Sequence, residues 1–491
     1  MKKVIIIGAG IAGLTAAIYA RKNGFDVEVY EMHTIPGGEC TGWNRGGYHF
    51  DNCIHWLTGT KPGSGLYKLW QTVGALEGID TYTASEFVAV KTGDVEVHMY
   101  QDIEKLRQHL KEISKEDAEA IDTYCEMILK IQQMNMPVEK PMEALNLLDY
   151  MRLWKEMKGA LSLMPKLSKQ YIEDYVSKFK HPALRRAISM DMERVNSHAP
   201  PFAMGIFSAG NGAWPMGGSL AMVKRMEKCA KDLGCKIYYK QKVKRILIKE
   251  TAAIGIELED GKVVTGDYIV PSNDLYVTLH NFLDGHYSDA KIDRYYRELE
   301  KHPGQTTVSI GVGVSCDLGS RPEHYSVEIE PFECGGKQIK TMAFKHFAYQ
   351  KDFAPEGHSV LMIQIPADYK YWKALKEQGD AYDKAKMALE ENIRRTLENV
   401  YEETKGHIEV VNIATPLTYE RYCGAYRGSW MPFVGNPETK NFIHNGKLKG
   451  IKNLYLAGQW LYTPGGLPSA AATGRWAIWR ICKKEKQTFI D

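Results

Sequence analysis

Three glycines near the start of the chain restrict its possible folds more than any other feature. Gly8, Gly10 and Gly13 form a G-x-G-x-x-G pattern directly after the apolar run 4–7. That run is short and β-branched, which is typical of a strand buried on both faces of a parallel sheet. Residues 11–22 have helical character, and residues 27–30 predict a second strand that ends at Glu31. This order of elements predicts a βαβ unit that binds a dinucleotide.

Each glycine has a physical role in such a unit. The first makes the tight turn, the second lets the backbone approach a pyrophosphate, and the third lets helix and strand pack closely. The helix N-terminus holds the anion, and the acid at the end of the second strand accepts hydrogen bonds from a ribose. The predicted contacts are Gly8, Gly10, Ile11, Ala12, Gly13 and Glu31.

The same stretch has a second interpretation as an export leader. Two lysines, a long apolar run and a small-residue end at Ala20 resemble a secretory signal. A leader, however, does not require glycines at fixed offsets or a following strand with a terminal acid. The dinucleotide site is therefore favoured over a leader or a simple glycine-rich turn.

Length and composition narrow the class of protein. At 491 residues the chain exceeds the usual size of one core, so two intertwined domains are expected. Its net charge of +3 gives no reason to expect a nucleic-acid partner. Nine scattered cysteines without a C-x-x-C pattern indicate reduced thiols in a cytoplasmic protein and no zinc site. No later apolar run reaches membrane-spanning length, so we expect a soluble chain with at most peripheral membrane contact.

A second glycine pair follows the predicted ribose acid. The stretch EMHTIPGGECTGWNRGGYHFDNCIH contains Glu31, Gly37, Gly38 and the segment 47–51. It resembles the corresponding region of FAD-dependent oxidoreductases in the phytoene desaturase, carotenoid isomerase and retinol saturase group of the flavin amine oxidase superfamily. The alternative is a plain surface loop. The resemblance implies FAD as the cofactor, with contacts from Met32, Gly37, Gly38 and Glu39.

The C-terminal stretch KNLYLAGQWLYTPGGLPSAAATGRWAIWRIC also resembles this group. Residues 454–457 predict a buried strand, and a helix is expected from about 470 to 482. A helix N-terminus facing the flavin would stabilise negative charge on the ring. Many relatives carry an acid where this chain has Gln459, which weakens one contact to the ribityl chain. The implied contacts are Gly458, Gln459, Gly466, Leu467 and Pro468.

A third matching stretch lies mid-chain, at WPMGGSLAMVKRMEKCAKDLGCKIYYKQKVKRILI. Ser219 is the expected cap of an amphipathic helix that ends at Gly234, with Leu233 on its apolar face. By resemblance, the backbone of Val243 packs against the adenine.

These stretches predict the domain organisation. The fold class is α/β, with a doubly wound, Rossmann-like FAD-binding domain built from the discontinuous segments 1–70, 206–285 and 441–491. Segments 71–205 and 286–440 are expected to form a mixed α+β substrate domain, with strands near 307–310 and 360–363 and a long charged helix near 380–400.

One helical stretch in the substrate domain mixes apolar and basic residues. MEALNLLDYMRLWKEMKGALSLMPKL contains Leu, Met, Tyr and Trp together with several lysines. It is compatible with a helix resting on a membrane or lining a lipid entry. The favoured interpretation is a helix that covers a substrate cavity or packs in the core.

The catalytic residues are predicted less directly. His55 follows the second glycine pair, and the alternative for it is a structural histidine. TPLTYERYCGAYRGSW resembles a family segment and places Tyr426 and Arg427 as residues that face substrate, although a packed turn is the favoured alternative. Neither a hydrolase motif nor a metal site is found.

The sequence therefore predicts an FAD-dependent oxidoreductase acting on carbon–carbon bonds of an apolar polyene, retinoid-like or fatty acyl substrate. Desaturation, saturation and cis–trans isomerisation all fit, and flavin amine oxidase or a flavin-bearing binding protein without turnover are the alternatives. No second strand–glycine–helix unit is found, so electrons are expected to pass to oxygen, a quinone or a docking carrier, or to return to the product. The sequence identifies neither the electron acceptor nor the oligomeric state.

Overall fold

The apolar run near the N-terminus forms the inner strand of a parallel sheet. The computed structural model describes residues 1–302, 304–433, 435–439 and 441–491. In it, β1 (Lys3–Ile7) lies between β2 (Asp26–Tyr30) and β14 (Tyr268–Pro271), and β10 (Lys236–Tyr238) pairs with β2. Successive β1 residues belong alternately to two hydrophobic cores: Val4 and Ile6 lie in one, and Ile5 and Ile7 lie in the other. The strand is therefore buried on both faces, as its β-branched run predicts.

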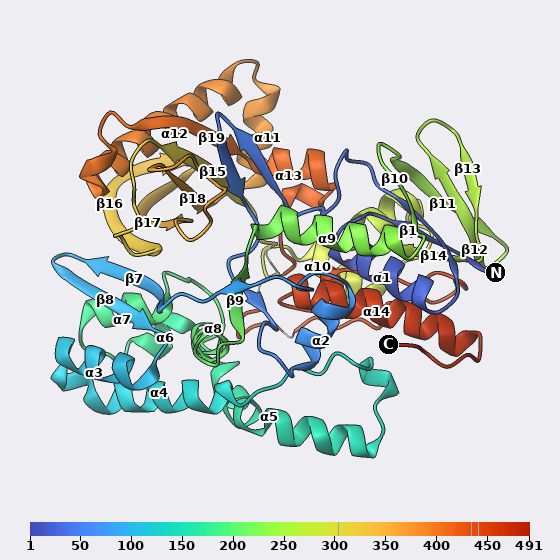
Figure 1. Ribbon diagram of the computed structural model, residues 1–491, viewed down its shortest axis with the longest axis horizontal. Helices are drawn as coiled ribbons and strands as arrows, with labels where there is room; N and C mark the ends of the chain where they lie inside the picture. The colour runs from blue at the N-terminus through green and yellow to red at the C-terminus, as the bar shows by residue number, and fades with distance from the viewer. Residues whose placement is uncertain (303, 434, 440) are drawn as a thin grey trace.

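Helices and a small antiparallel sheet cover this parallel sheet (Figure 1). The helices are α1 (Ile11–Lys22), α9 (Gly218–Asp232) and α14 (Leu467–Lys484). The antiparallel sheet has the order β11 (Val243–Lys249), β12 (Ala252–Leu258), β13 (Val263–Thr265). A Cβ on Gly474 would lie 2.3 Å from the carbonyl oxygen of Ala12, so only glycine permits α1 and α14 to pack this closely. We call these elements the cofactor unit.

Three local expectations need correction. Residues 454–457 are buried, but they form only an isolated bridge from Leu454 to Ile269 and hydrogen bonds to the β14 backbone, because the chain turns away at Gly458. Ser219 lies inside α9 and does not cap it, because its hydroxyl donates to Asp51 instead. Leu233 lies at the C-terminal end of α9 and is 38% exposed, outside the apolar face.

Strands from both predicted substrate segments join in one mixed sheet. Within the described residues its order is β19-β15-β18-β17-β16-β7-β8. The bounds are β7 (Glu86–Thr92), β8 (Val95–Tyr100), β15 (Thr307–Val314), β16 (His324–Cys334), β17 (Lys337–His346), β18 (Ser359–Pro366) and β19 (Ile408–Ala414). The helices α11 (Tyr369–Glu377), α12 (Ala381–Val400) and α13 (Pro416–Cys423) follow in this part of the chain. The predicted boundary at residue 440 lies outside the described residues.

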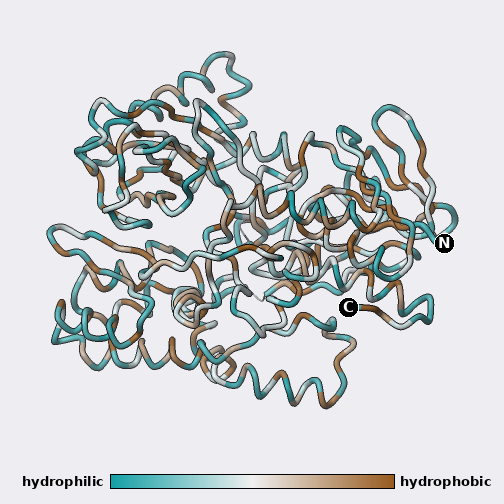
Figure 2. Tube along the Cα trace, in the orientation of Figure 1, coloured by the Kyte–Doolittle hydropathy of each residue, from teal (hydrophilic) through white to brown (hydrophobic). Residues whose placement is uncertain are grey.

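A group of helices occupies the lower part of the view in Figure 1. It contains α3 (Ile103–Ile113), α4 (Ala118–Gln132), α5 (Leu147–Leu167), α6 (Ile172–Val176), α7 (Pro182–Ser189) and α8 (Ala199–Ser208). α5 lies at the lower edge, and hydrophobic positions recur along its trace in Figure 2. Asn146 caps it through a capping box with Asp149, which fixes where this helix begins.

The remaining elements connect these parts. They are the hairpin β3 (Gly42–Arg45) and β4 (Tyr48–Asp51), the short strands β5 (Leu57–Thr58), β6 (Thr81–Tyr82) and β9 (Gly212–Pro215), and the helices α2 (Gly65–Thr72) and α10 (Ala290–Arg297). β9 pairs with both β5 and β6, so segment 212–215 ties the cofactor unit to the chain that precedes β7.

Candidate functional site

A large cavity connects the cofactor unit with the lower helices. Its volume is about 2930 Å³, and its wall contains Gly8, residues of β17 and β18, and Met157 of α5. Pockets for single small ligands measure roughly 300–1,000 Å³. This cavity therefore has room for two ligands end to end, such as a dinucleotide and a long apolar molecule.

The first glycine motif forms one end of this cavity. Gly8 has a φ of 97°, a conformation that favours glycine, and Gly10 is the N-cap of α1 with no side-chain cap on the following amides. A Cβ on Gly13 would lie 1.9 Å from the carbonyl oxygen of Gly8. The turn and the close helix–strand packing thus require glycine, and the uncapped amides of the first turn of α1 suit an anion.

Glu31 stands beside this turn in a fixed orientation. Its carboxylate accepts hydrogen bonds from the amides of Ala9, at 2.7 Å, and His33, at 2.8 Å. Burial raises the pKa of Glu31, and these two backbone bonds oppose the increase. The carboxylate is therefore placed where a ribose hydroxyl can donate to it.

The second glycine pair lies against the first motif. The Gly37 amide donates to the carbonyl oxygen of Ala9 at 2.9 Å, and a Cβ on Gly38 would lie 3.7 Å from the Cα of Gly10. Next to them, one carboxylate oxygen of Glu39 is buried without a hydrogen-bond partner among the described residues, and burial raises the Glu39 pKa well above its usual value. We call the glycine turn at residues 8–13 the cradle. An unpaired buried acceptor beside this cradle suits a ligand that carries both phosphates and hydroxyl groups.

The N-terminus of α14 faces the same cavity. Its N-cap, Gly466, offers no side-chain cap, so the amides of Leu467 and Ser469 remain available, while Pro468 between them has no N–H. Gln459 holds this turn with both ends of its amide: it accepts from the Gly466 amide at 3.0 Å and donates to the carbonyl of Trp430 at 3.0 Å. Its side chain is thus engaged by the protein itself.

A half-buried polar cluster lies next to this turn. The ring of His55 is 5.6 Å from that of Trp430, and Lys345 donates from Nζ to the carbonyl oxygens of Ile54 and His55 at 3.0 and 3.3 Å. Burial, assisted by the charge on Lys345, lowers the His55 pKa to about 4. Burial also lowers the Lys345 pKa to about 7. His55 is therefore neutral near pH 7, whereas Lys345 can exchange a proton there.

The other two predicted catalytic residues do not share one position. The ring of Tyr426 stacks on Tyr276 with centroids 3.7 Å apart, and its amide donates to Asp274 at 3.2 Å. Tyr426 lines the cavity, whereas Arg427 is not among the lining residues that the structure describes. Arg427 lies over the Tyr426 ring in a turn with a φ of 54°, as the packed-turn alternative predicts.

Most predicted site residues meet in this one cavity. Gly13 is not in the wall and packs behind it, against Gly8. The lining residues that the sequence singled out are Gly8, Gly10, Ile11, Ala12, Glu31, Met32, Gly37, Gly38, Glu39, His55, Val243, Tyr426, Gly458, Gln459, Gly466, Leu467 and Pro468.

Asp274 and Lys345 are among the lining residues that the sequence did not reveal. Asp274 is fully enclosed, and burial raises its pKa to about 6 although Tyr296 donates to it at 2.9 Å. The sequence could have revealed Asp274, because it closely follows the strand predicted at 268–270 and ligands bind at the carboxyl ends of parallel strands. Lys345 gave no such signal, since its neighbours in β17 read as an ordinary strand.

Comparisons with known proteins agree with this geometry. Residues 6–73 match the model of the NAD(P)-binding Rossmann-like domain, so the chain carries a dinucleotide-binding domain of this type. A 4,4'-diaponeurosporene oxygenase of Staphylococcus aureus is 21% identical, over 99% of each chain. A chloroplastic prolycopene isomerase of Daucus carota is 23% identical, over 99% of this chain and 82% of that protein. This chain is a homologue of both enzymes.

A solved structure shows the same fold at lower identity. Wild-type putrescine oxidase bound to putrescine superposes with a TM-score of 0.60 at 13% identity, over 98% of this chain and 99% of that one. The likeness shows that the two chains share an α/β fold over nearly their whole lengths.

The described residues also bear on membrane spans and metal sites. Among those residues, none of the helices is both long and apolar enough to cross a bilayer. In the same part of the chain, no three His, Cys, Asp or Glu side chains gather closely enough to hold a metal ion.

Proposed function

We propose that this protein is an FAD-dependent oxidoreductase acting on carbon–carbon bonds of an apolar polyene, retinoid-like or fatty acyl substrate. The observation that carries the proposal is the continuous cavity, which begins at the glycine cradle and ends among apolar side chains. Its far end is lined by Met136, Met157, Phe202 and Ile206. Full-length homology to two enzymes whose names refer to carotenoids supports the same substrate class.

The residues at the cradle fit FAD. The amides at the start of α1 would hold the pyrophosphate, and Glu31 would accept from the ribose. Among the described residues, one carboxylate oxygen of Glu39 and the amide oxygen of Asn273 have no hydrogen-bond partner. Both could accept from further hydroxyl groups of FAD. The uncapped N-terminus of α14 would supply partial positive charge beside the ring. When bound, FAD supplies a ring that takes up or returns a hydride at N5.

The chain's own residues would position the substrate and handle protons. The apolar far end excludes water and aligns a long molecule. Nζ of Lys345 would exchange a proton near neutral pH, and the backbone carbonyl of neutral His55 accepts a hydrogen bond from it. Desaturation requires loss of a hydride and a proton, saturation requires their return, and isomerisation requires neither in net terms. The same wall serves all three reactions.

An anaerobic titration tests the proposal. Purified holoprotein is mixed with carotenoids, retinols, unsaturated fatty acids and amines, and the flavin absorbance is followed. We expect bleaching, or isomerisation detected by chromatography after chemical reduction, with a polyene or lipid substrate. Bleaching by amines alone would assign the protein to the amine oxidases. A complete lack of response would favour a binding protein without turnover.

A further inference from the structure

Exposed apolar side chains are concentrated in one segment. Among the described residues, fifteen large hydrophobic side chains are exposed, and seven of them lie between positions 142 and 161. The seven are Met142, Leu147, Leu148, Tyr150, Met151, Trp154 and Leu161. An apolar patch of this kind usually marks an interaction surface. The core-packing alternative for this helix is wrong, because only Ala160 and Leu167 of α5 are buried.

Most of the patch forms one stripe along α5. Leu147, Tyr150, Met151, Trp154 and Leu161 recur at spacings of three, four and seven, which places them on one face of a helix. Leu147 is 76% exposed and Trp154 is 64% exposed. We call these five residues the α5 stripe.

Uncompensated lysines accompany the stripe. Lys155, Lys158, Lys166 and Lys169 are exposed, and within the described part of the chain none has a carboxylate at ion-pair distance. The two acids of the helix are already engaged, since Asp149 pairs with Lys140 and Glu156 with Arg152. The surface therefore combines apolar side chains with net positive charge, which matches an anionic lipid surface.

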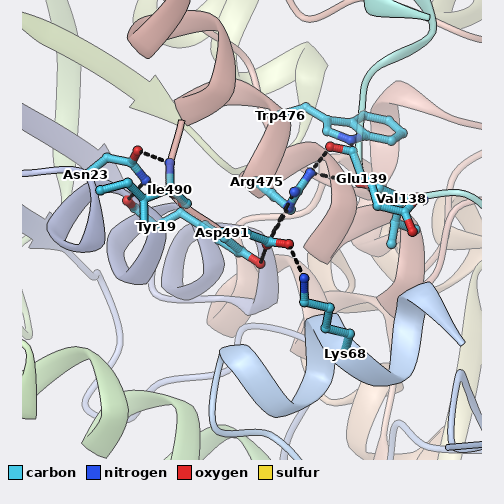
Figure 3. Close-up of polar contacts among 9 residues, drawn as sticks. All are labelled: Tyr19, Asn23, Lys68, Val138, Glu139, Arg475, Trp476, Ile490 and Asp491. Carbon is cyan, nitrogen blue, oxygen red and sulfur yellow. Dashed lines mark hydrogen bonds and ion pairs between the residues drawn. The ribbon is translucent and has the colours of Figure 1, made fainter. Parts of the chain in front are cut away.

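The segment that leads into α5 is held to α14 of the cofactor unit. Arg475 of α14 donates to the carbonyl oxygens of Val138 and Glu139, and Trp476 donates to Val138 at 2.8 Å (Figure 3). Asp491 pairs with both Arg475 and Lys68 in the same view. A few residues further along, Arg480 pairs with Glu143 at 2.6 Å. The chain is thus anchored to the cofactor unit just before the helix that carries the stripe.

The inner side of the same helix lines the cavity. Leu153, Met157, Ala160 and Met164 contribute to the wall, at spacings of three and four. Leu161 is both part of the stripe, at 43% exposure, and part of the wall. The outer apolar surface is therefore continuous with the apolar end of the cavity.

We propose that the α5 stripe lies in the headgroup region of an anionic lipid bilayer, so that the cavity opens toward the lipid. Apolar side chains enter the interface while the lysines contact anionic headgroups. An apolar substrate then reaches the cavity along α5 without crossing water. The docking stands on the surface of α5, and only the identity of what enters rests on the proposed function.

Vesicle cosedimentation of the holoprotein tests the proposal. We expect binding to phosphatidylcholine vesicles that contain phosphatidylglycerol, and weaker binding to phosphatidylcholine alone. The double variant Leu147→Glu/Trp154→Glu should lower the partition coefficient at least about tenfold. The control Val263→Glu/Met387→Glu changes two other exposed apolar residues, outside α5, and should bind as the wild type does.

The lysines allow a second, independent test in the same vesicle assay. Lys155→Gln/Lys158→Gln should lose about thirtyfold in binding to anionic vesicles and little on neutral ones, because each of the two lysines contributes about 1 kcal/mol near the surface. Lys249→Gln/Lys405→Gln is the control. Failure of the wild type to bind either vesicle overturns the proposal, as does equal loss in the controls. A dimer that the stripe variant disrupts in light scattering would assign the stripe to a second copy. Binding needs no turnover, so the proposed function is tested separately.

Discussion

The two ends of the cavity are built in different ways. At the cradle, backbone geometry forms the site: Gly8 has a positive φ, and Gly13 has no room for a Cβ. At the α5 end, the wall consists of flexible apolar side chains such as Met157 and Met164. Backbone geometry tolerates few residues, whereas an apolar wall accepts many of similar volume. The cofactor end is therefore restrictive in sequence, and the substrate end is permissive.

Gly13→Val tests the restrictive end and has the largest expected effect. The added Cβ would lie 1.9 Å from the Gly8 carbonyl oxygen and must separate α1 from β1. We expect at least about tenfold weaker cofactor binding, measured by the flavin content of the purified protein. Ala20→Gly on the same helix is the control, since it costs about 1 kcal/mol of helix stability without touching the cradle. Equal flavin loss in both variants would refute the steric explanation.

Arg475→Met tests how the two ends are joined. Arg475 is buried and holds the segment before α5, so its loss leaves the Glu139 carbonyl without this donor, whereas the Val138 carbonyl keeps the Trp476 donor. We expect a loss of about 3 kcal/mol and faster amide exchange across residues 138–167, with β15 and β18 unchanged. Arg321→Met removes a more exposed pair with Glu403 and should cost less than about 1 kcal/mol. An equal increase in amide exchange over the whole chain would show that the effect of Arg475 is not local.

Much of the cofactor end was predictable and much of the substrate end was not. The βαβ unit follows from residues 4–31 because strand, turn and helix are local in sequence. The cavity wall brings together β17, β18, α5 and α14, which are far apart along the chain, so no local pattern reveals it. The exposure of Trp154 was equally hidden, because the same spacing fits a buried helix. The place of Lys345 in the site was hidden too, because it depends on where β17 lies relative to His55.

Lys345→Met examines the polar cluster between the two ends. Burial lowers the Lys345 pKa to about 7 in the folded state, whereas the unfolded lysine titrates near 10.5. Below about pH 7 the folded chain bears the full cost of a buried cation, and this cost disappears as pH rises toward 10.5. Between pH 6.5 and 9 the wild type should gain about 2 kcal/mol in unfolding free energy relative to the variant. A pH-independent difference in urea denaturation would contradict this.

Gln459→Ala should have the smallest effect. It removes the hydrogen bonds to Gly466 and Trp430 that hold the turn before α14. We expect a loss of about 1–2 kcal/mol in stability and a faster release of cofactor. Gln459→Glu keeps the acceptor for the Gly466 amide and loses only the donor, so it should fall between the alanine variant and the wild type. Thermal denaturation and flavin release kinetics would show whether that order holds.

The identity of the bound nucleotide tests the central claim most directly. The native protein is purified, denatured, and the released nucleotide is identified by chromatography and mass spectrometry against the amount of chain. We expect FAD in a ratio close to one per chain, or uptake to that ratio when FAD is added to colourless protein. A colourless protein that takes up no FAD would contradict the account, because the cradle, Glu31 and α14 would then hold no flavin together.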